Sequence, residues 1–183
     1  MAKKVSMILA CTLDGGIGYE NKIPWNIPDD LRKFKAVTTR TIDSMKMNAV
    51  LMGRGTWESL QKHLPNRLNI VITKNGNMIN DPSVLVFLDI ASALRFCEWD
   101  GIETVFVIGG AQIYNTFLHN YENIKINKIY LSMMFYEASQ HKMDTFINME
   151  YIWKNFNLTK HIKYERESKQ LLFASYVCSP KEV

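Results

Sequence analysis

The sequence predicts an α/β fold whose central sheet is mostly parallel and ends in an antiparallel C-terminal hairpin. Short, nearly unbroken apolar runs, such as 5–11 and 104–108, are typical of strands buried on both faces. Helix-like segments separate these runs along the chain, as they do in parallel sheets. The last two strand-like stretches, 158–165 and 170–178, are separated only by a polar turn, which is typical of a hairpin.

Signals at the ends of the apolar runs define the order of the elements. The first strand leads into a glycine-rich loop at 14–18, and Pro28 then fits the first turn of a helix that continues to about residue 37. Further strands are expected at 49–52, 69–73, 84–87, 104–108 and 128–132. Further helices are expected from the junction at 53–56 through residue 60, at 90–99 and at 111–118.

Length and composition favour one domain spanning residues 1–183 and exclude several classes of protein. Of the 183 residues, 47% are hydrophobic and 22% are charged, which excludes disordered, collagen-like and fibrous chains. The net charge is +4 and no basic run exceeds two residues, so no nucleic acid partner is expected. No apolar run approaches the roughly 18 residues that span a bilayer. We expect a cytoplasmic protein without a membrane partner.

The cysteines and histidines form neither a disulfide framework nor a metal motif. Cys11, Cys97 and Cys178 are odd in number, far apart and outside any CxxC spacing. The four histidines lack spacings such as HxxxH. We therefore expect no bound metal.

Asp30 is the first candidate functional residue. At about 100° per residue it falls inside the apolar stripe of its helix, which is formed by Leu31, Phe34 and Val37. The basic residues of this helix are expected to point mostly elsewhere: Arg32, Lys33 and Lys35. A buried carboxylate is costly without a partner or a function. Two interpretations stay open: Asp30 caps the start of the helix, or it meets a cationic or hydrogen-bonding ligand in an apolar pocket.

Two strand–glycine–helix junctions, at 52–56 and 108–111, predict a ligand that carries phosphate. Glycine lets backbone N–H groups approach a ligand closely, and helix N-termini attract phosphate. Two such junctions at buried strand ends favour a dinucleotide lying across the carboxyl edge of the sheet. Arg54, Thr73 and Lys74 add cations and a hydroxyl for an extra phosphate. The chain carries neither the Rossmann glycine fingerprint nor a Walker-type loop.

Two further residues each admit a functional and a structural interpretation. Trp25, flanked by Pro24 and Pro28, either forms a wall of a glycine-rich lid over an active site or packs into the core from a surface loop. Arg67 either clamps a carboxylate in bidentate fashion or is one of the chain's solvated arginines.

Five blocks of sequence occur in a specific order along nearly the whole chain. They are Gly16-Ile17-Gly18 with the segment 23–35, then 50–60, 64–67, 107–114 and 144–146. Together these blocks resemble the dihydrofolate reductase family. The resemblance implies an eight-stranded, mostly parallel sheet with helices on both faces and a cis peptide bond between Gly109 and Gly110.

The resemblance also implies an activity, a cofactor and partners. The family reduces 7,8-dihydrofolate to 5,6,7,8-tetrahydrofolate with NADPH, which supplies one-carbon metabolism and thymidylate synthesis. Besides dihydrofolate, the expected ligands are antifolate inhibitors. We expect a monomer unless the chain is fused to thymidylate synthase.

Carried over position by position, the family's roles fall on three groups of residues. The expected catalytic residues are Asp30, the single ionisable group of the pterin pocket, and Trp25. The expected substrate-binding residues are Ile8, Asp30, Leu31, Phe34, Lys35, Leu60, Leu64, Arg67, Ile108, Tyr114 and Ser132. The expected cofactor-binding residues are Ala10, Gly16, Ile17, Gly18, Asn21, Gly53, Arg54, Gly55, Thr56, Thr73, Lys74, Gly109, Gly110, Ala111, Gln112, Ile113, Tyr114 and Thr145.

Four positions depart from the family's commoner choices. Gly55 stands where a second basic residue or His is frequent, and Ser132 stands where Thr is usual. Asn66 replaces a frequent Gly, and no Pro follows Phe146. Two other functions remain open: a related reductase acting on a pyrimidine or another pteridine, and an inactive folate- or RNA-binding protein of the same fold.

Overall fold

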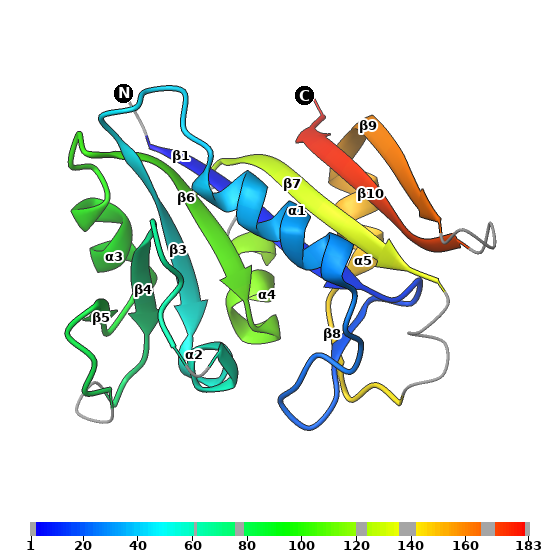
Figure 1. Ribbon diagram of the computed structural model, residues 1–183, viewed down its shortest axis with the longest axis horizontal. Coiled ribbons are helices and arrows are strands. Elements are labelled where there is room, and N and C mark those ends of the chain that lie inside the picture. The colour runs from blue at the N-terminus through cyan, green and yellow to red at the C-terminus, as the bar shows by residue number, and fades with distance from the viewer. Residues whose placement is uncertain are drawn as a thin grey trace.

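An eight-stranded sheet forms the centre of the computed structural model (Figure 1), which describes residues 3–60, 62–75, 79–119, 124–135, 142–165 and 171–181. In sheet order the strands are β5 (Val84–Phe87), β4 (Leu68–Ile72), β3 (Met47–Gly53), β6 (Ile102–Gly109), β1 (Lys4–Cys11), β7 (Ile126–Met134), β10 (Leu171–Pro180) and β9 (Phe156–Glu165). The pairings from β5 to β7 are all parallel. β10 runs antiparallel to both of its neighbours, β7 and β9, and it forms the expected hairpin with β9. The predicted fold class is confirmed.

Helices cover both faces of this sheet. α1 (Pro28–Thr39) and α2 (Arg54–Leu60) pack on one face through Phe34, Val37 and Leu60, over a cluster that includes Val50 and Phe106. The other face carries α3 (Ile90–Phe96), α4 (Ala111–His119) and α5 (Met149–Asn155) over the larger core cluster. In Figure 1 α1 crosses in front of β1 and β7, with α4 behind the sheet. Strands between two such layers are buried on both faces, which explains the unbroken apolar runs.

Three short elements have no counterpart in the sequence-based prediction. β2 (Gly16–Gly18) pairs with β8 (Thr145–Phe146) in a separate two-stranded sheet. α5 begins after Asn148, whose side chain accepts a hydrogen bond from the Tyr151 backbone N–H.

α3 ends at Phe96 rather than at residue 99, because the chain then tightens into turns in which Trp99 N–H donates to the Phe96 carbonyl. The polar turn of the hairpin and His141 lie outside the described residues.

The parallel strands bring both predicted glycine junctions to one edge of the sheet. Met52 of β3 is in register with Gly109 of β6, and Gly53 is in register with Ile72 of β4. Thr73 follows directly after β4, so it lies at the same edge. Within the described residues, no cluster of three or more metal-binding side chains occurs. No described helix is long and apolar enough to cross a membrane.

Candidate active site

Asp30 lies in the first turn of α1 and is bonded across to the sheet. The N-cap of α1 is Ile27, and no side chain caps this helix end, so the capping interpretation of Asp30 is wrong. Asp29 instead pairs with Arg32 at the surface. The Asp30 carboxyl accepts a hydrogen bond of 2.6 Å from the Ser132 hydroxyl of β7. Burial raises the pKa of Asp30, while the Ser132 hydrogen bond and the charge of Lys33 oppose that shift.

Lys33 corrects one expectation about this helix. Its ammonium does not point away from the site but donates a hydrogen bond of 2.7 Å to the Ser132 hydroxyl. Burial lowers the pKa of Lys33 to about 8, and the Asp30 charge partly offsets this shift. Asp30 therefore has an ionisable neighbour one hydroxyl away. The helical angle predicted where the Cβ of Lys33 points, but its four-carbon stem lets the ammonium turn back over the sheet.

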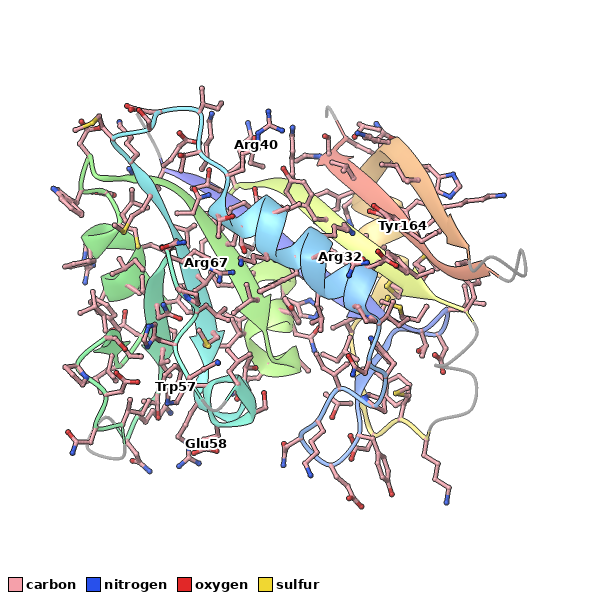
Figure 2. The ribbon with its side chains drawn as sticks, in the orientation of Figure 1. Arg32, Arg40, Trp57, Glu58, Arg67 and Tyr164 are labelled. Carbon is pink, nitrogen blue, oxygen red and sulfur yellow. The ribbon has the colours of Figure 1, made fainter. Side chains whose placement is uncertain are left out.

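Arg67 is buried rather than solvated, with 8% of its surface exposed. Its Nη1 donates to the Thr38 hydroxyl at 2.8 Å and its Nε donates to the Pro65 carbonyl at 3.0 Å. The guanidinium lies 5.9 Å from the ring centre of Phe34. Asn66, with a φ of 60°, makes the left-handed turn that precedes it. The arginine is thus fixed beside α1 (Figure 2) with its fork oriented by the protein.

An apolar wall connects these polar groups. Five expected substrate-site residues belong to or pack against one cluster between α1, α2 and the sheet: Ile8, Phe34, Leu60, Leu64 and Ile108. Leu31 departs from the expected buried stripe, because 57% of its surface is exposed. Lys35 is exposed as well. These two residues stand outside the packed wall, so the stripe of α1 is narrower than its sequence predicts.

A cavity of about 970 Å³ lies at the carboxyl edge of the sheet. Every expected cofactor residue except Gly16 lines it: Ala10, Ile17, Gly18, Asn21, Gly53, Arg54, Gly55, Thr56, Thr73, Lys74, Gly109, Gly110, Ala111, Gln112, Ile113, Tyr114 and Thr145. Residues outside the expected cofactor-binding set also line it, among them Lys22, Ser59 and Asp89. Ser59 belongs to the block 50–60, whereas Lys22 and Asp89 belong to none of the five blocks and are brought to the cavity by the fold.

The glycines of the cavity differ in what surrounds them. A Cβ on Gly109, whose φ is 121°, would lie 3.2 Å from the Tyr114 ring, and one on Gly110 would lie 3.3 Å from the Thr56 hydroxyl. The peptide bond between these two glycines is cis, as the resemblance implied. A Cβ on Gly55, by contrast, would meet nothing within 4 Å. Steric demands therefore require glycine at Gly109 but not at Gly55.

The glycine-rich loop is tied down in the described structure. Gly16 N–H donates to the Thr12 hydroxyl at 2.8 Å, and Glu20 N–H donates to the Asp144 carboxylate at 2.8 Å. A Cβ on Gly16 would collide with Thr12 and Met143, so this glycine serves close packing. Trp25 is 7% exposed and packs in a cluster with Ile27, Met134 and Phe173. Its position favours the core interpretation over a freely moving wall.

Ser132 lies where the cavity and the Asp30 carboxyl meet. It is in register with Ala10 of β1, which lines the cavity. Tyr114 also lines the cavity, and its hydroxyl donates to the Ile8 carbonyl at 2.8 Å. Burial is the main cause that raises the pKa of Tyr114, and the charge of Asp30 adds to it. Ser132 therefore links the partly buried Asp30 carboxyl to the strand position next to Ala10 of the cavity lining.

Comparison with known proteins relates this arrangement to one family. A family model described as dihydrofolate reductase matches residues 4–178. The bifunctional dihydrofolate reductase-thymidylate synthase of Paramecium tetraurelia is 36% identical over 190 residues, covering 93% of this chain and 39% of that protein. The dihydrofolate reductase of Candida albicans is 44% identical over 109 residues, covering 57% of this chain and 56% of that protein. The matched region is less than two thirds of either relative.

A solved structure has the same fold. Dihydrofolate reductase from Enterococcus faecalis, complexed with NADP(H) and RAB-propyl, aligns with a TM-score of 0.80 at 23% identity. The alignment covers 100% of this chain and 99% of that chain. Because the family model extends from β1 into β10 and the Paramecium relative matches nearly the whole chain, this protein belongs to the dihydrofolate reductase family.

Proposed function

We propose that this chain is an NADPH-dependent oxidoreductase that reduces 7,8-dihydrofolate to 5,6,7,8-tetrahydrofolate. The observation that carries the proposal is the partly buried Asp30 carboxyl, which is bonded to Ser132, a residue in register with Ala10 of the large cavity. Family membership supports the same reaction. The product would supply one-carbon transfer and thymidylate synthesis, and residues 1–183 would form a single reductase domain.

Asp30 has the chemistry needed at the pterin. A carboxyl on an apolar wall accepts hydrogen bonds from an amino group and a ring N–H of the pterin side by side. Because burial raises its pKa, the carboxyl also holds a proton closer to neutral pH than an exposed aspartate does. It thereby promotes protonation of the ring nitrogen that makes the neighbouring imine carbon electrophilic. Phe34 and Ile108 exclude water from this part of the site.

The residues of the large cavity fit NADPH. A Cβ at Gly109 or Gly110 would enter space against Tyr114 or Thr56, so backbone groups there can lie close to a ligand. Arg54, Thr73 and Lys74 line the same cavity and supply positive charge and a hydroxyl for a 2′-phosphate. When bound, NADPH supplies the hydride. The protein's part is to hold the two rings in a dry, oriented arrangement.

Arg67 suits the glutamate tail of a folate. Thr38 and Pro65 hold two of its nitrogens, which orients the planar fork before a ligand arrives. A preoriented guanidinium binds a carboxylate more strongly than a freely rotating one, because less side-chain entropy is lost. This feature favours a folate over a pteridine without the tail. Antifolates that carry both a pterin-like ring and a carboxylate would occupy the same positions.

A direct assay tests the proposal. Purified protein is mixed with 7,8-dihydrofolate and NADPH, and the loss of NADPH absorbance is followed, with NADH in a parallel reaction. We expect fast loss that is selective for NADPH, because Arg54, Thr73 and Lys74 favour the extra phosphate. Binding of NADPH without turnover would instead support an inactive binder. Turnover only with a pyrimidine or another pteridine would assign the chain to a related reductase.

A further inference from the structure

A second hollow of about 510 Å³, here called the α1 groove, borders the other side of α1. Lys33 lines it from α1, and Tyr130 of β7 and Tyr164 of β9 line it from the sheet. Tyr164 lies on the opposite side of α1 from Arg67 (Figure 2). The α1 groove shares no lining residue with the cofactor cavity, and it reaches the cluster under α1 through Val37, Phe106 and Tyr130.

Ser132 lies between the α1 groove and the active site. In the sheet it is in register with Ala10, which lines the cofactor cavity, and with Ser175, which lines the α1 groove. Lys33 contacts the Ser132 hydroxyl from the groove at 2.7 Å, and that hydroxyl contacts Asp30 at 2.6 Å. One hydroxyl thus connects a cation in the groove with the carboxyl of the active site.

The chemistry of the three groups fixes the direction of this connection. A lysine ammonium can only donate, so Ser132 Oγ must accept from Lys33, and its single proton is then directed to Asp30. An ionised Lys33 therefore favours an ionised Asp30 in two ways, through its charge and through the orientation of the hydroxyl. Without Lys33, the Ser132 hydroxyl can rotate, and a protonated Asp30 can donate to it instead.

Other charged groups are present around this chain of bonds. Tyr114 of α4 lies close enough to feel the charge of Asp30. The remaining ionisable residues of the groove come from β1, β6, β7, β9 and the loop after α1: Lys4, Arg40, Glu103, Lys128, Tyr130, Lys160 and Tyr164. Among the described residues, Lys33 is the cation whose charge acts on Asp30. The local coupling therefore runs through Lys33 and Ser132.

We propose that Lys33 is a positioning residue that sets the proton affinity of Asp30 from the α1 groove, acting through the Ser132 hydroxyl. The inference rests on the proposed function for its consequence in catalysis, but the coupling itself is a property of the free protein. Loss of the Lys33 charge should raise the pH at which Asp30 titrates by roughly one unit, the lower end of the effect of a close opposite charge.

The test follows Asp30 directly in the free protein. Aspartate is labelled with ¹³C at its carboxyl, and the NMR signal of Asp30, assigned by its loss in Asp30→Asn, is titrated with pH. Lys33→Met removes the charge and keeps the apolar stem, whereas Lys33→Arg keeps the charge and the donors. Arg32→Met is the matched control, since it removes one positive charge from an exposed position on the same helix.

The expected pattern is an upward shift of the Asp30 titration in Lys33→Met, a near-normal titration in Lys33→Arg and no shift in Arg32→Met. An unchanged midpoint in Lys33→Met, or equal shifts in Lys33→Met and Arg32→Met, overturns the proposal. Ser132→Ala provides a second route if Lys33→Met does not fold: Asp30 must then titrate at higher pH, and an unchanged midpoint there also overturns the proposal.

Activity gives an independent readout. In the reductase assay, the limb of the pH profile of kcat/KM for dihydrofolate that reports Asp30 should move in the same direction in Lys33→Met. If the protein reduces no dihydrofolate, the proposed function fails while the NMR titration still decides the role of Lys33. A shifted kcat/KM profile with an unshifted NMR midpoint overturns the role of Lys33 in the free protein.

Discussion

The two halves of the candidate active site differ in which groups form them: bonded side chains in one half, and more exposed glycine backbone in the other. On the substrate side, Asp30 and Arg67 are side chains held by other side chains, through Ser132 and Thr38. On the cofactor side, five glycines contribute backbone to the cavity lining, and a Cβ on one of them, Gly55, would meet nothing within 4 Å. On the first side Arg67 is buried and Asp30 is partly buried, whereas on the second side Gly55 and Lys74 are exposed.

This difference determines how each half responds to substitution. A side chain fixed by its neighbours is preorganised, so its loss removes both a contact and the geometry that made the contact strong. A backbone surface tolerates added side chains wherever space is open, and there a new charge can improve binding. Substitutions should therefore have large negative effects on the substrate side and small, even favourable, effects at the open positions of the cofactor side.

The largest expected effect is that of Asp30→Asn. This change preserves shape but removes the group that promotes protonation, so turnover at neutral pH should fall roughly 10²–10⁴-fold. NADPH binding should stay close to normal, because Asp30 is absent from the lining of the large cavity. Steady-state kinetics and a fluorescence titration with NADPH measure the two quantities. Asp29→Asn is the control, and near-normal turnover in Asp30→Asn would remove Asp30 from the mechanism.

Arg67→Ala should have the next largest effect, and it should depend on the ligand. A charge-assisted hydrogen bond contributes about 1.5–3 kcal/mol, so folate binding should weaken roughly 10–100-fold. A pteridine without the glutamate tail should lose far less. Arg67→Lys keeps the charge but lacks the planar guanidinium, so its folate affinity should lie between those of the unchanged protein and Arg67→Ala. Equal losses for both ligands would exclude the clamp.

Sequence patterns predicted most of the sheet well because its parallel strands are nearly unbroken apolar runs, which are visible locally in the sequence. β2 and β8 escaped prediction because each is too short to show periodicity, and their pairing joins residues more than 120 positions apart. α5 carried a readable signal in its cap residue Asn148 and in the buried pair Met149 and Ile152. Short helices with few apolar residues are easily missed by a search for longer stripes.

In the candidate site, too, features that depend on local sequence could be predicted, and contacts between distant residues could not. Glycine junctions are visible in sequence because the chemistry lies in the backbone, and the expected residues gather around one cavity. The contact of Lys33 with Ser132 was not visible, because it depends on the rotamer of a flexible side chain and on the position of a residue 99 positions away. The burial of Arg67 likewise depends on Thr38, which belongs to no motif.

Gly55→Arg tests the cofactor side, where a gain is expected. Gly55 is the second residue of α2, and a side chain there meets nothing within 4 Å. An added exposed charge pair contributes about 0.2–1 kcal/mol, so NADPH should bind up to about fivefold more tightly. Binding of NADH, which lacks the 2′-phosphate, should not change. Gly55→Ala controls for helix propensity. An equal gain in affinity for NADH would contradict the placement of the 2′-phosphate near Gly55.

The smallest expected effect is on stability. Burial raises the pKa of Asp30 in the folded protein above 3.8, its pKa in the unfolded chain. Its stabilising contribution is therefore complete below pH 3.8 and is lost as the pH rises through the pKa of the folded protein. At neutral pH the buried carboxylate therefore costs stability. Asp30→Asn should raise Tm at pH 7, and the gain should vanish near pH 3. A lower Tm for Asp30→Asn than for the unchanged protein at pH 7 would contradict the predicted gain in stability.

Amide hydrogen exchange, measured in the free protein and in its NADPH complex, tests the contrast between the two halves most directly. NADPH should slow exchange at residues 53–56 and 109–113, while α1 should change little because its side chains are already bonded to Ser132 and Arg67. Protection centred on α1, with no change at the two glycine junctions, would contradict this prediction.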